Sequence, residues 1–154
     1  MLFLSLSSHL VYNEYWGSAN KTEIDKLIIL QKKCLRLISH AHPLSHCLPL
    51  AKNLNILMIN DLFVYNILVL MYSVHNLSCS PVFTSQFRKC CTVHCINTRL
   101  ARLHFFMFPC HTNIRRNFIV MKGPTLWTSL SVIIRESCSL LIFNRNLRND
   151  IYKS

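Results

Sequence analysis

The chain has 154 residues, of which 17 are lysine or arginine and 6 are aspartate or glutamate, so its formal net charge is +11. This length suits one ordinary domain, and 51% hydrophobic residues with 15% charged residues are far from the composition of a disordered basic tail. No two acids are adjacent and only two glycines occur, which excludes a two-metal carboxylate site and a glycine-rich phosphate loop and favours a compact, basic, non-catalytic module.

The first predicted helix begins at Thr22, whose hydroxyl forms an approximate capping box with Asp25. Seven residues then recur at spacings of three and four, which places one mainly apolar stripe on the helix. The stripe comprises Ile24, Leu27, Ile28, Gln31, Cys34, Leu35 and Ile38. The basic residues largely off the stripe are Lys26, Lys32, Lys33 and Arg36. We predict that the stripe packs on the core and that the basic side chains are solvated.

Pro43 and Pro49 interrupt the following segment, because proline lacks an amide donor and disfavours helix in the residue before it. We therefore predict a loop over residues 41–53. A second helix is predicted from Asn60 or Asp61, both good capping residues, to about residue 74. Since this helix is apolar on nearly every face, we expect it to be the central element of the core.

The chain is less regular after residue 76. Residues 77–98 show no sustained period and predict a connecting region, with at most a short helix around residues 83–88. Residues 100–120 contain apolar runs that suit short strands or buried irregular segments equally. Gly123 and Pro124 predict a forced bend, and the two tryptophans are expected to be structural anchors.

A terminal amphipathic helix is predicted from Ser137 or Ser139. Four apolar residues recur along it at helical spacing, namely Leu140, Phe143, Leu147 and Ile151. The predicted fold is therefore mainly α, a single module of residues 1–154. Its parts are a helical segment (1–76), an irregular segment with possible short strands (77–122) and a terminal segment (123–154).

Neither secretion nor a membrane span is expected. The most apolar run, residues 62–74, is shorter than the about 20 residues that a spanning helix requires. The N-terminus has no basic region of a secretory signal and no clear cleavage site. We therefore expect the eight cysteines to be reduced and the chain to be intracellular, in the cytoplasm or the nucleus.

Two sets of metal-ligating residues occur in irregular segments. One contains Cys90, Cys91, His94 and Cys95, with Cys110 and His111 further along, and the other contains His40, His42, His46 and Cys47. Neither has a C-x-x-C pair, and adjacent side chains rarely bind the same ion, so loops without metal are favoured over a small zinc-binding module. No signature of a nucleophilic cysteine–histidine pair appears, so we expect no cofactor and no catalytic residue.

Basic residues outnumber acids in several segments and are interleaved with phenylalanines at 105, 106, 108 and 118. Cations that neutralise phosphates, beside aromatic rings that stack on bases, are typical of non-specific nucleic-acid grooves. The candidate RNA- or DNA-binding residues are Lys32, Lys33, Arg36, Arg99, Arg102, Arg115, Arg116 and Lys122. The alternative is that these cations are only solvated and that the phenylalanines belong to the core.

Six segments of the chain follow a recognisable order. They are YWGS (15–18), LIILQKKCLRLIS (27–39), LNILMINDLFVYNILVLMY (54–72), NTR (97–99), GPTLW (123–127) and SLLIFNRNLR (139–148). In this order they resemble the C-terminal end of reverse transcriptases of jockey-like non-LTR retrotransposons, over nearly the whole chain. Residues 128–131 and Asn144 depart from the pattern of that family.

The resemblance implies a segment that follows the catalytic palm. In that family an adjacent pair of aspartates in the palm holds the metal ions of polymerisation, whereas the three aspartates here are isolated. The resemblance therefore implies a non-catalytic fragment that contacts nucleic acid and that has an intact polymerase domain as a further partner. The alternative is a translated remnant of the element without selected activity, which exposes the apolar faces that once packed on the palm.

Overall fold

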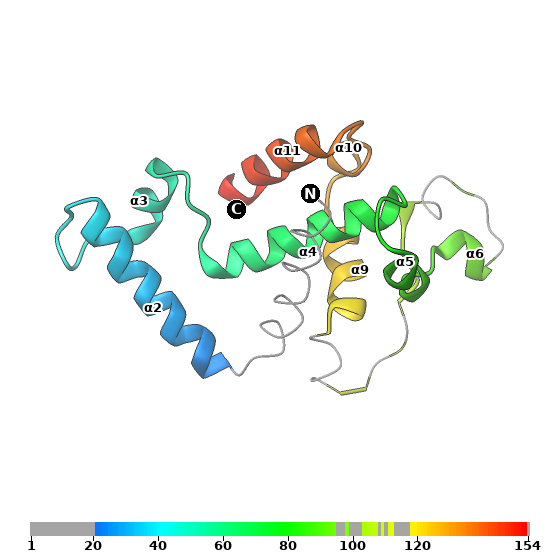
Figure 1. Cartoon of the computed structure of the whole chain (residues 1–154), viewed down its shortest axis with the longest axis horizontal. Coiled ribbons are helices and arrows are strands. Elements are labelled where there is room, and N and C mark those ends of the chain that lie inside the picture. The colour runs from blue at the N-terminus through cyan, green and yellow to red at the C-terminus, as the bar shows by residue number, and fades with distance from the viewer. Residues whose placement is uncertain are drawn as a thin grey trace.

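The computed structural model describes residues 21–94, 98, 103–107, 109, 111–112 and 118–153. Within these residues the chain forms eight helices, which confirms the predicted mainly α fold (Figure 1). They are α2 (Lys21–Ile38), α3 (Cys47–Asn53), α4 (Ile59–His75), α5 (Pro81–Gln86), α6 (Cys90–His94), α9 (Ile119–Ser129), α10 (Val132–Arg135) and α11 (Leu140–Lys153).

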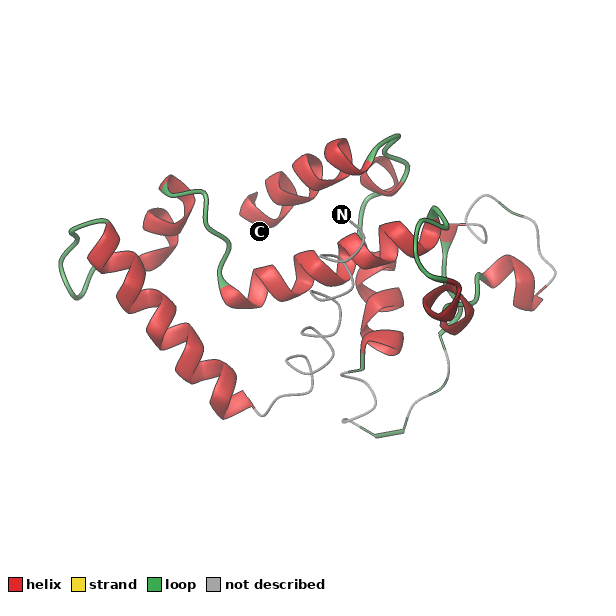
Figure 2. Ribbon diagram, viewed as in Figure 1, coloured by secondary structure: helices red, strands yellow, loops and turns green. Residues whose placement is uncertain are grey.

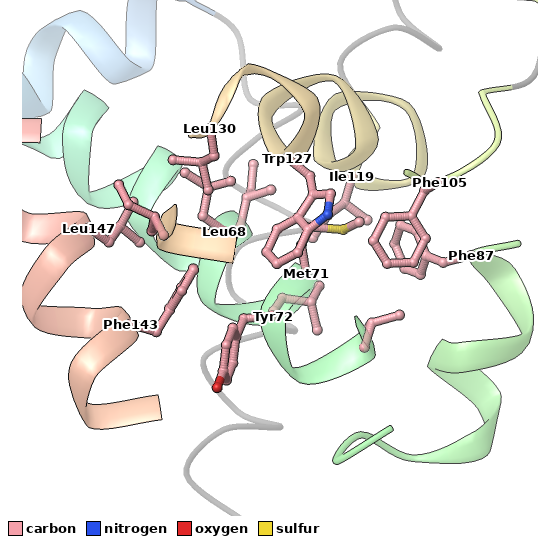
Figure 3. Close-up of a cluster of buried hydrophobic side chains, with 14 residues drawn as sticks. Leu68, Met71, Tyr72, Phe87, Phe105, Ile119, Trp127, Leu130, Phe143 and Leu147 are labelled. Atoms are coloured by element: carbon pink, nitrogen blue, oxygen red, sulfur yellow. The ribbon is translucent and has the colours of Figure 1, made fainter. Parts of the chain in front are cut away.

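Helix α4 is the central element of the core, as its apolar sequence predicts. It packs on α9 and on α11, which lie on different sides of it in Figure 1. The buried cluster joins six α4 residues, Ile67, Leu68, Leu70, Met71, Tyr72 and Val74, to side chains from α9, α11 and the segments between them. Figure 3 shows Met71 and Tyr72 facing these side chains. Residues far apart in the sequence thus share one core.

Trp127 of α9 is the anchor of this core. Its side chain is fully buried, and its indole Nε1 donates a hydrogen bond of 2.8 Å to the carbonyl oxygen of Leu103. Its ring lies 6.1 Å from the ring of Phe105 and 6.2 Å from that of Phe143, centroid to centroid. Because the one polar atom of the indole is bonded, the large apolar surface is buried without an unsatisfied donor.

Helices α2 and α3 form a second, smaller cluster. It consists of the buried residues Leu35, Cys47 and Ala51, with Ile56 and Met58 packed against them. The predicted stripe on α2 is only partly correct, since Cys34 and Ile38 are exposed. Helix α2 packs mainly on the short helix α3 and makes fewer contacts with α4.

The capping residues differ from the prediction. The described part of α2 starts at Lys21, so Thr22 lies within the helix instead of preceding it as a cap. Neither Asn60 nor Asp61 caps α4, because that helix begins one residue earlier, at Ile59. The amide of Ile59 instead donates to Oε1 of Gln31, at 3.0 Å. A side chain of α2 therefore caps α4, which explains a polar residue within the predicted stripe.

The predicted loop at residues 41–53 is wrong over its second half. Helix α3 begins at Cys47 and places Pro49 at its third position. The first four amides of a helix have no intrahelical acceptor, so a proline there removes no helical hydrogen bond. The short helix predicted at 83–88 occurs as α5, whereas α6 and α10 were not predicted.

The segment before α9 forms no strand within its described residues. Figure 2 shows helices and loops there, and the only strand-like pairing among those residues is an isolated antiparallel bridge between Lys89 and Phe105. The bridge rests on bonds from the Cys90 amide to the His104 carbonyl oxygen, at 2.9 Å, and from the Phe106 amide to the Arg88 carbonyl oxygen, at 2.7 Å. In the apolar run 118–121, Phe118 is the N-cap of α9 and the next three residues open that helix, so both alternatives, a strand and an irregular segment, are wrong for that run.

The forced bend predicted at Gly123 and Pro124 is also wrong, since both lie inside α9 and are buried. A Cβ on Gly123 would lie 2.7 Å from Sδ of Met71 in α4. Glycine is therefore required for the close approach of α9 to α4, not for a turn. Pro124 leaves the carbonyl of Val120 without its helical donor.

The terminal helix occurs where it was predicted, although Leu140 of its predicted apolar row is 36% exposed. Helix α11 begins at Leu140, and Oγ of Ser139 accepts a long hydrogen bond of 3.4 Å from the amide of Ile142. Phe143 and Leu147 are fully buried. No helix of the described residues combines the length and the apolar content that a bilayer span needs. The six cysteines in the described part of the chain are free thiols, and Cys95 and Cys110 lie outside that part.

Candidate nucleic-acid interface

Helix α2 presents three of the predicted cations on one side. Lys32 and Lys33 are exposed. Arg36 follows them by four and three residues, which places it on the same side of the helix, one turn further along. Its guanidinium is half-buried, and its Nε donates to the carbonyl oxygen of Ser45 at 3.2 Å. The three residues, named the α2 basic face below, combine two exposed lysines with one arginine that a hydrogen bond holds in position.

A groove of about 430 Å³ adjoins the α2 basic face. Its polar lining consists of Lys32, Arg36, Ser45, His46, Asn60 and Asp61. Burial raises the pKa of the Asp61 carboxyl above its usual value. When ionised, this carboxylate repels phosphates, so Asp61 opposes the attraction of Lys32 and Arg36 for an anion in the groove.

Lys122 does not belong to this surface. It lies on α9, apart from α2 in Figure 1, and is half-buried. Its ammonium nitrogen lies 4.6 Å from the ring centroid of Phe63, and burial lowers its pKa. The side chain thus packs against α4, and a phosphate at Lys122 would compete with this contact.

The other four predicted cations, Arg99, Arg102, Arg115 and Arg116, lie outside the described residues, as does Phe108. Phe105 is buried in the main cluster and Phe106 is half-buried, whereas Phe118 is 48% exposed. The alternative that these rings are core residues therefore holds for Phe105. A row of stacking aromatic rings is not formed by the described residues.

The zinc alternative and the expected lack of a nucleophilic cysteine both concern the histidine and cysteine side chains. Those residues contain no group of three histidine, cysteine or acidic side chains placed to bind a metal ion. Burial raises the pKa of the Cys79 and Cys90 thiols, which is opposite to the shift that activates a cysteine nucleophile. Cys95 and Cys110 lie outside the description.

One buried cation escaped the sequence analysis. Arg135 of α10 is 5% exposed, and two of its guanidinium nitrogens have no hydrogen-bond partner within the described residues. In the sequence it follows three apolar residues and precedes Glu136, a pattern that does not distinguish a buried arginine from a solvated one. Only the packing of distant segments determines its burial.

Comparison with known proteins finds no relative of this chain. No family model matches it. No curated protein and no solved structure is significantly similar to it. The resemblance to retrotransposon reverse transcriptases therefore rests on the six sequence segments alone and stays a prediction.

Proposed function

We propose that the chain is a non-catalytic module that binds the sugar–phosphate backbone of RNA or DNA through the α2 basic face. The observation that carries this proposal is the exposure of Lys32 and Lys33 beside Arg36, which is held by its bond to Ser45. Exposed lysines exchange water and counterions for phosphates at little structural cost. We also propose that the module derives from the C-terminal region of a non-LTR retrotransposon reverse transcriptase.

The expected binding is electrostatic and tolerant of sequence. The formal net charge of +11 attracts polyanions from a distance and increases the rate of encounter. Phosphate contacts position a protein but do not read bases, and of the phenylalanines interleaved with the predicted cations Phe105 is buried and cannot stack on a base. We therefore expect similar affinities for unrelated sequences of equal length.

The experiment is a charge reversal on the α2 basic face. Lys32→Glu with Lys33→Glu is expected to weaken binding of a fluorescent single-stranded oligonucleotide by roughly tenfold or more at moderate salt, measured by anisotropy. The matched control is Arg88→Glu with Arg145→Glu, which changes the net charge equally at two exposed positions outside α2. An equal loss in both double variants would show a diffuse charge effect and contradict the proposal.

A second candidate is a fragment without activity that lacks its packing partner. It is favoured by an apolar patch on α2 that differs from the predicted stripe. In this patch Leu30, Leu37 and Ile38 are 55%, 74% and 59% exposed. These residues lie at spacings of seven and eight from Leu30, on one side of the helix. In a retrotransposon polymerase this apolar patch would pack on the preceding domain.

The two candidates differ in their solution behaviour. A fragment that lacks its partner is expected to self-associate in size-exclusion chromatography and to unfold without a cooperative calorimetric transition. Leu30→Glu with Leu37→Glu is then expected to convert the associated protein to a monomer, because charges on this apolar patch oppose association. A wild-type monomer with one sharp transition contradicts this second candidate.

A further inference from the structure

The groove beside the α2 basic face is large enough for a ligand. It lies between α2, the loop before α3, and the residues at which α3 and α4 begin. Its volume of about 430 Å³ is within the range of roughly 300–1,000 Å³ that is usual for small-molecule pockets. Leu48, Met58 and Asp61 also line a second hollow of about 470 Å³, which α11 lines as well. The two hollows therefore adjoin, which leaves room for a planar group beside Lys32 and Arg36.

Contacts between α2 and the neighbouring segments hold the walls of this groove. Nε of Arg36 donates to the carbonyl oxygen of Ser45 at 3.2 Å. Sγ of Cys47 lies 3.8 Å from the carbonyl oxygen of Lys32. The side chain of Gln31 bonds the backbone at the start of α4. A ligand would therefore enter a groove whose walls are already positioned, which reduces the free energy spent on ordering them.

The groove combines apolar side chains with the cations. Its apolar lining consists of Ile28, Leu44, Cys47, Leu48 and Met58. Leu44 and Leu48 are 86% and 50% exposed, so apolar surface lies in water next to charged groups. Covering this surface with a flat apolar face is favourable. A nucleobase has two such faces, and unpaired bases are bound elsewhere between aromatic or apolar side chains.

Asp61 gives the groove an acceptor that the described part of the chain does not use. No described residue forms a hydrogen bond or an ion pair with its carboxylate. An ionised carboxylate can only accept, so it repels a phosphate inside the groove but bonds an N–H group. Every nucleobase has an N–H donor on its Watson–Crick edge, and this edge is accessible only when the base is unpaired. The groove therefore suits a base better than a phosphate.

We propose that the groove binds one unpaired nucleobase of a strand whose phosphates contact Lys32 and Arg36. The proposal rests on the proposed function, which supplies that strand. The base lies against the apolar lining and donates an N–H group to Asp61. His46 and Asn60 also line the groove, and side chains of both types can donate and accept. Bases of different kinds therefore fit, and binding stays tolerant of sequence.

A preference for single strands over duplexes follows, because the bases of a duplex are paired and stacked. Electrostatic attraction alone predicts the opposite preference. Each phosphate contact contributes about −0.9 to the slope of log K against log salt for a duplex and about −0.7 for a single strand. The two expectations therefore differ in sign.

The test compares three probes of equal length that bind the full chain at moderate salt, measured by fluorescence anisotropy. They are a single strand of mixed sequence, a strand of abasic tetrahydrofuran units and a duplex. The abasic strand keeps every phosphate, and we expect it to bind roughly fivefold more weakly than the intact strand, or weaker still. We expect the duplex to bind more weakly as well.

The outcomes separate the two proposals. Equal affinity for the intact and abasic strands, or tighter binding of the duplex than of the single strand, would overturn the base site and leave the phosphate contacts standing. No binding of any probe would overturn both the base site and the proposed function.

Variants locate the base through the ratio of the affinities for the intact and abasic strands, in which effects on phosphate contacts cancel. Leu44→Ser changes an 86% exposed side chain, so we expect it to fold and to lower the ratio by roughly twofold or more. Leu141→Ser is the matched control, since Leu141 is 81% exposed on α11 and outside the groove, and it should leave the ratio unchanged. Asp61→Ala should lower the ratio while the abasic strand binds more tightly, because a repulsive charge is lost. An unchanged ratio in both groove variants, or an equal fall in the control, would overturn the proposal.

Discussion

Leu77 adopts a left-handed backbone conformation, with φ of 55°, directly after the C-cap of α4. The amide of Ser78 reaches back to the carbonyl oxygen of Ser73 at 2.9 Å, as in a Schellman motif. This position normally carries glycine, because a Cβ in the left-handed region costs about 1 kcal/mol. The Leu77 side chain is 74% exposed, so it recovers little of that cost by packing.

We therefore predict that Leu77→Gly stabilises the protein by about 0.5–1 kcal/mol in chemical denaturation. The matched control is Leu37→Gly, because Leu37 is also 74% exposed but lies within α2. Glycine in a regular helix is expected to destabilise by about 0.5–1 kcal/mol. Destabilisation by both substitutions would show that the side chain of Leu77, and not its backbone, determines the effect.

His75 predicts a pH dependence of stability. Burial, followed by the charges of Lys89 and Arg135, lowers its pKa from 6.5 to about 4. Between these two values the unfolded ring binds a proton that the folded ring does not bind, so the free energy of unfolding falls as the pH drops from about 6.5 towards 4. The ring is half-buried, so we expect a loss of about 1–2 kcal/mol, less than the full shift implies.

The measurement is urea denaturation at several pH values between 7 and 5. His75→Phe is expected to reduce the loss of stability with falling pH. Part of this loss is expected to remain, because the pKa of His104 is lowered as well and changes the stability in the same direction. An unchanged pH dependence in His75→Phe would show that His75 titrates as it does in the unfolded chain.

Among the contacts between helices, the side chain of Gln31 joins α2 to the start of α4. Its Oε1 accepts from the amide of Ile59, at 3.0 Å, and its Nε2 donates to the carbonyl oxygen of Leu57, at 2.9 Å. The amide side chain thus bonds two backbone groups, the carbonyl of Leu57 before α4 and the first amide of α4. Since α2 and α3 share only a small cluster, this pair of bonds is a main connection between α2 and the core helix.

We predict that Gln31→Ala destabilises the protein by about 1–3 kcal/mol, because it leaves two partly buried backbone groups unsatisfied. Lys32→Ala is the control, since Lys32 is adjacent and exposed, and it should change the stability by less than about 0.5 kcal/mol. Gln31→Glu keeps the acceptor and removes the donor, so an intermediate loss is expected. Equal stability of Gln31→Ala and the wild type in thermal unfolding contradicts this role.

The sequence predicted those elements whose own periodicity determines them. The apolar pattern of α4 and the spacing of Phe143 and Leu147 in α11 identify these helices without reference to the rest of the chain. Pro49 predicts a loop and Pro124 a bend, yet both lie in helices. Proline is tolerated in a first helical turn, where Pro49 lies, whereas Pro124 lies inside α9 and is buried. The cap from Gln31 is a contact over 28 residues and has no local signal.

The same distinction applies to the candidate sites. Exposure of Lys32 and Lys33 follows from their position off the helical stripe, so the sequence could predict it. The burial of Arg135 and the packing of Lys122 on Phe63 depend on how α9 and α10 meet α4. Such contacts between distant segments cannot be read from spacing along one helix.

At the scale of the whole molecule, an excess of positive charge surrounds an apolar core. The main cluster combines α4, α9, α10 and α11, whereas the α2 basic face lies on the less extensively packed α2. The only ion pair between described side chains joins Lys26 to Glu23 at 2.8 Å, and both side chains are well exposed. Within the described residues the other cations of α2 form no ion pair with an acid, which favours a polyanionic partner.

The most direct test of this account is the salt dependence of oligonucleotide binding by the full chain. For a single strand, each phosphate contact contributes about −0.7 to the slope of log K against log salt. We predict a steep linear fall in affinity for the wild type, and a slope reduced by about 1.4 for Lys32→Ala with Lys33→Ala. Binding that is absent, insensitive to salt, or unchanged in slope in this variant would contradict the account.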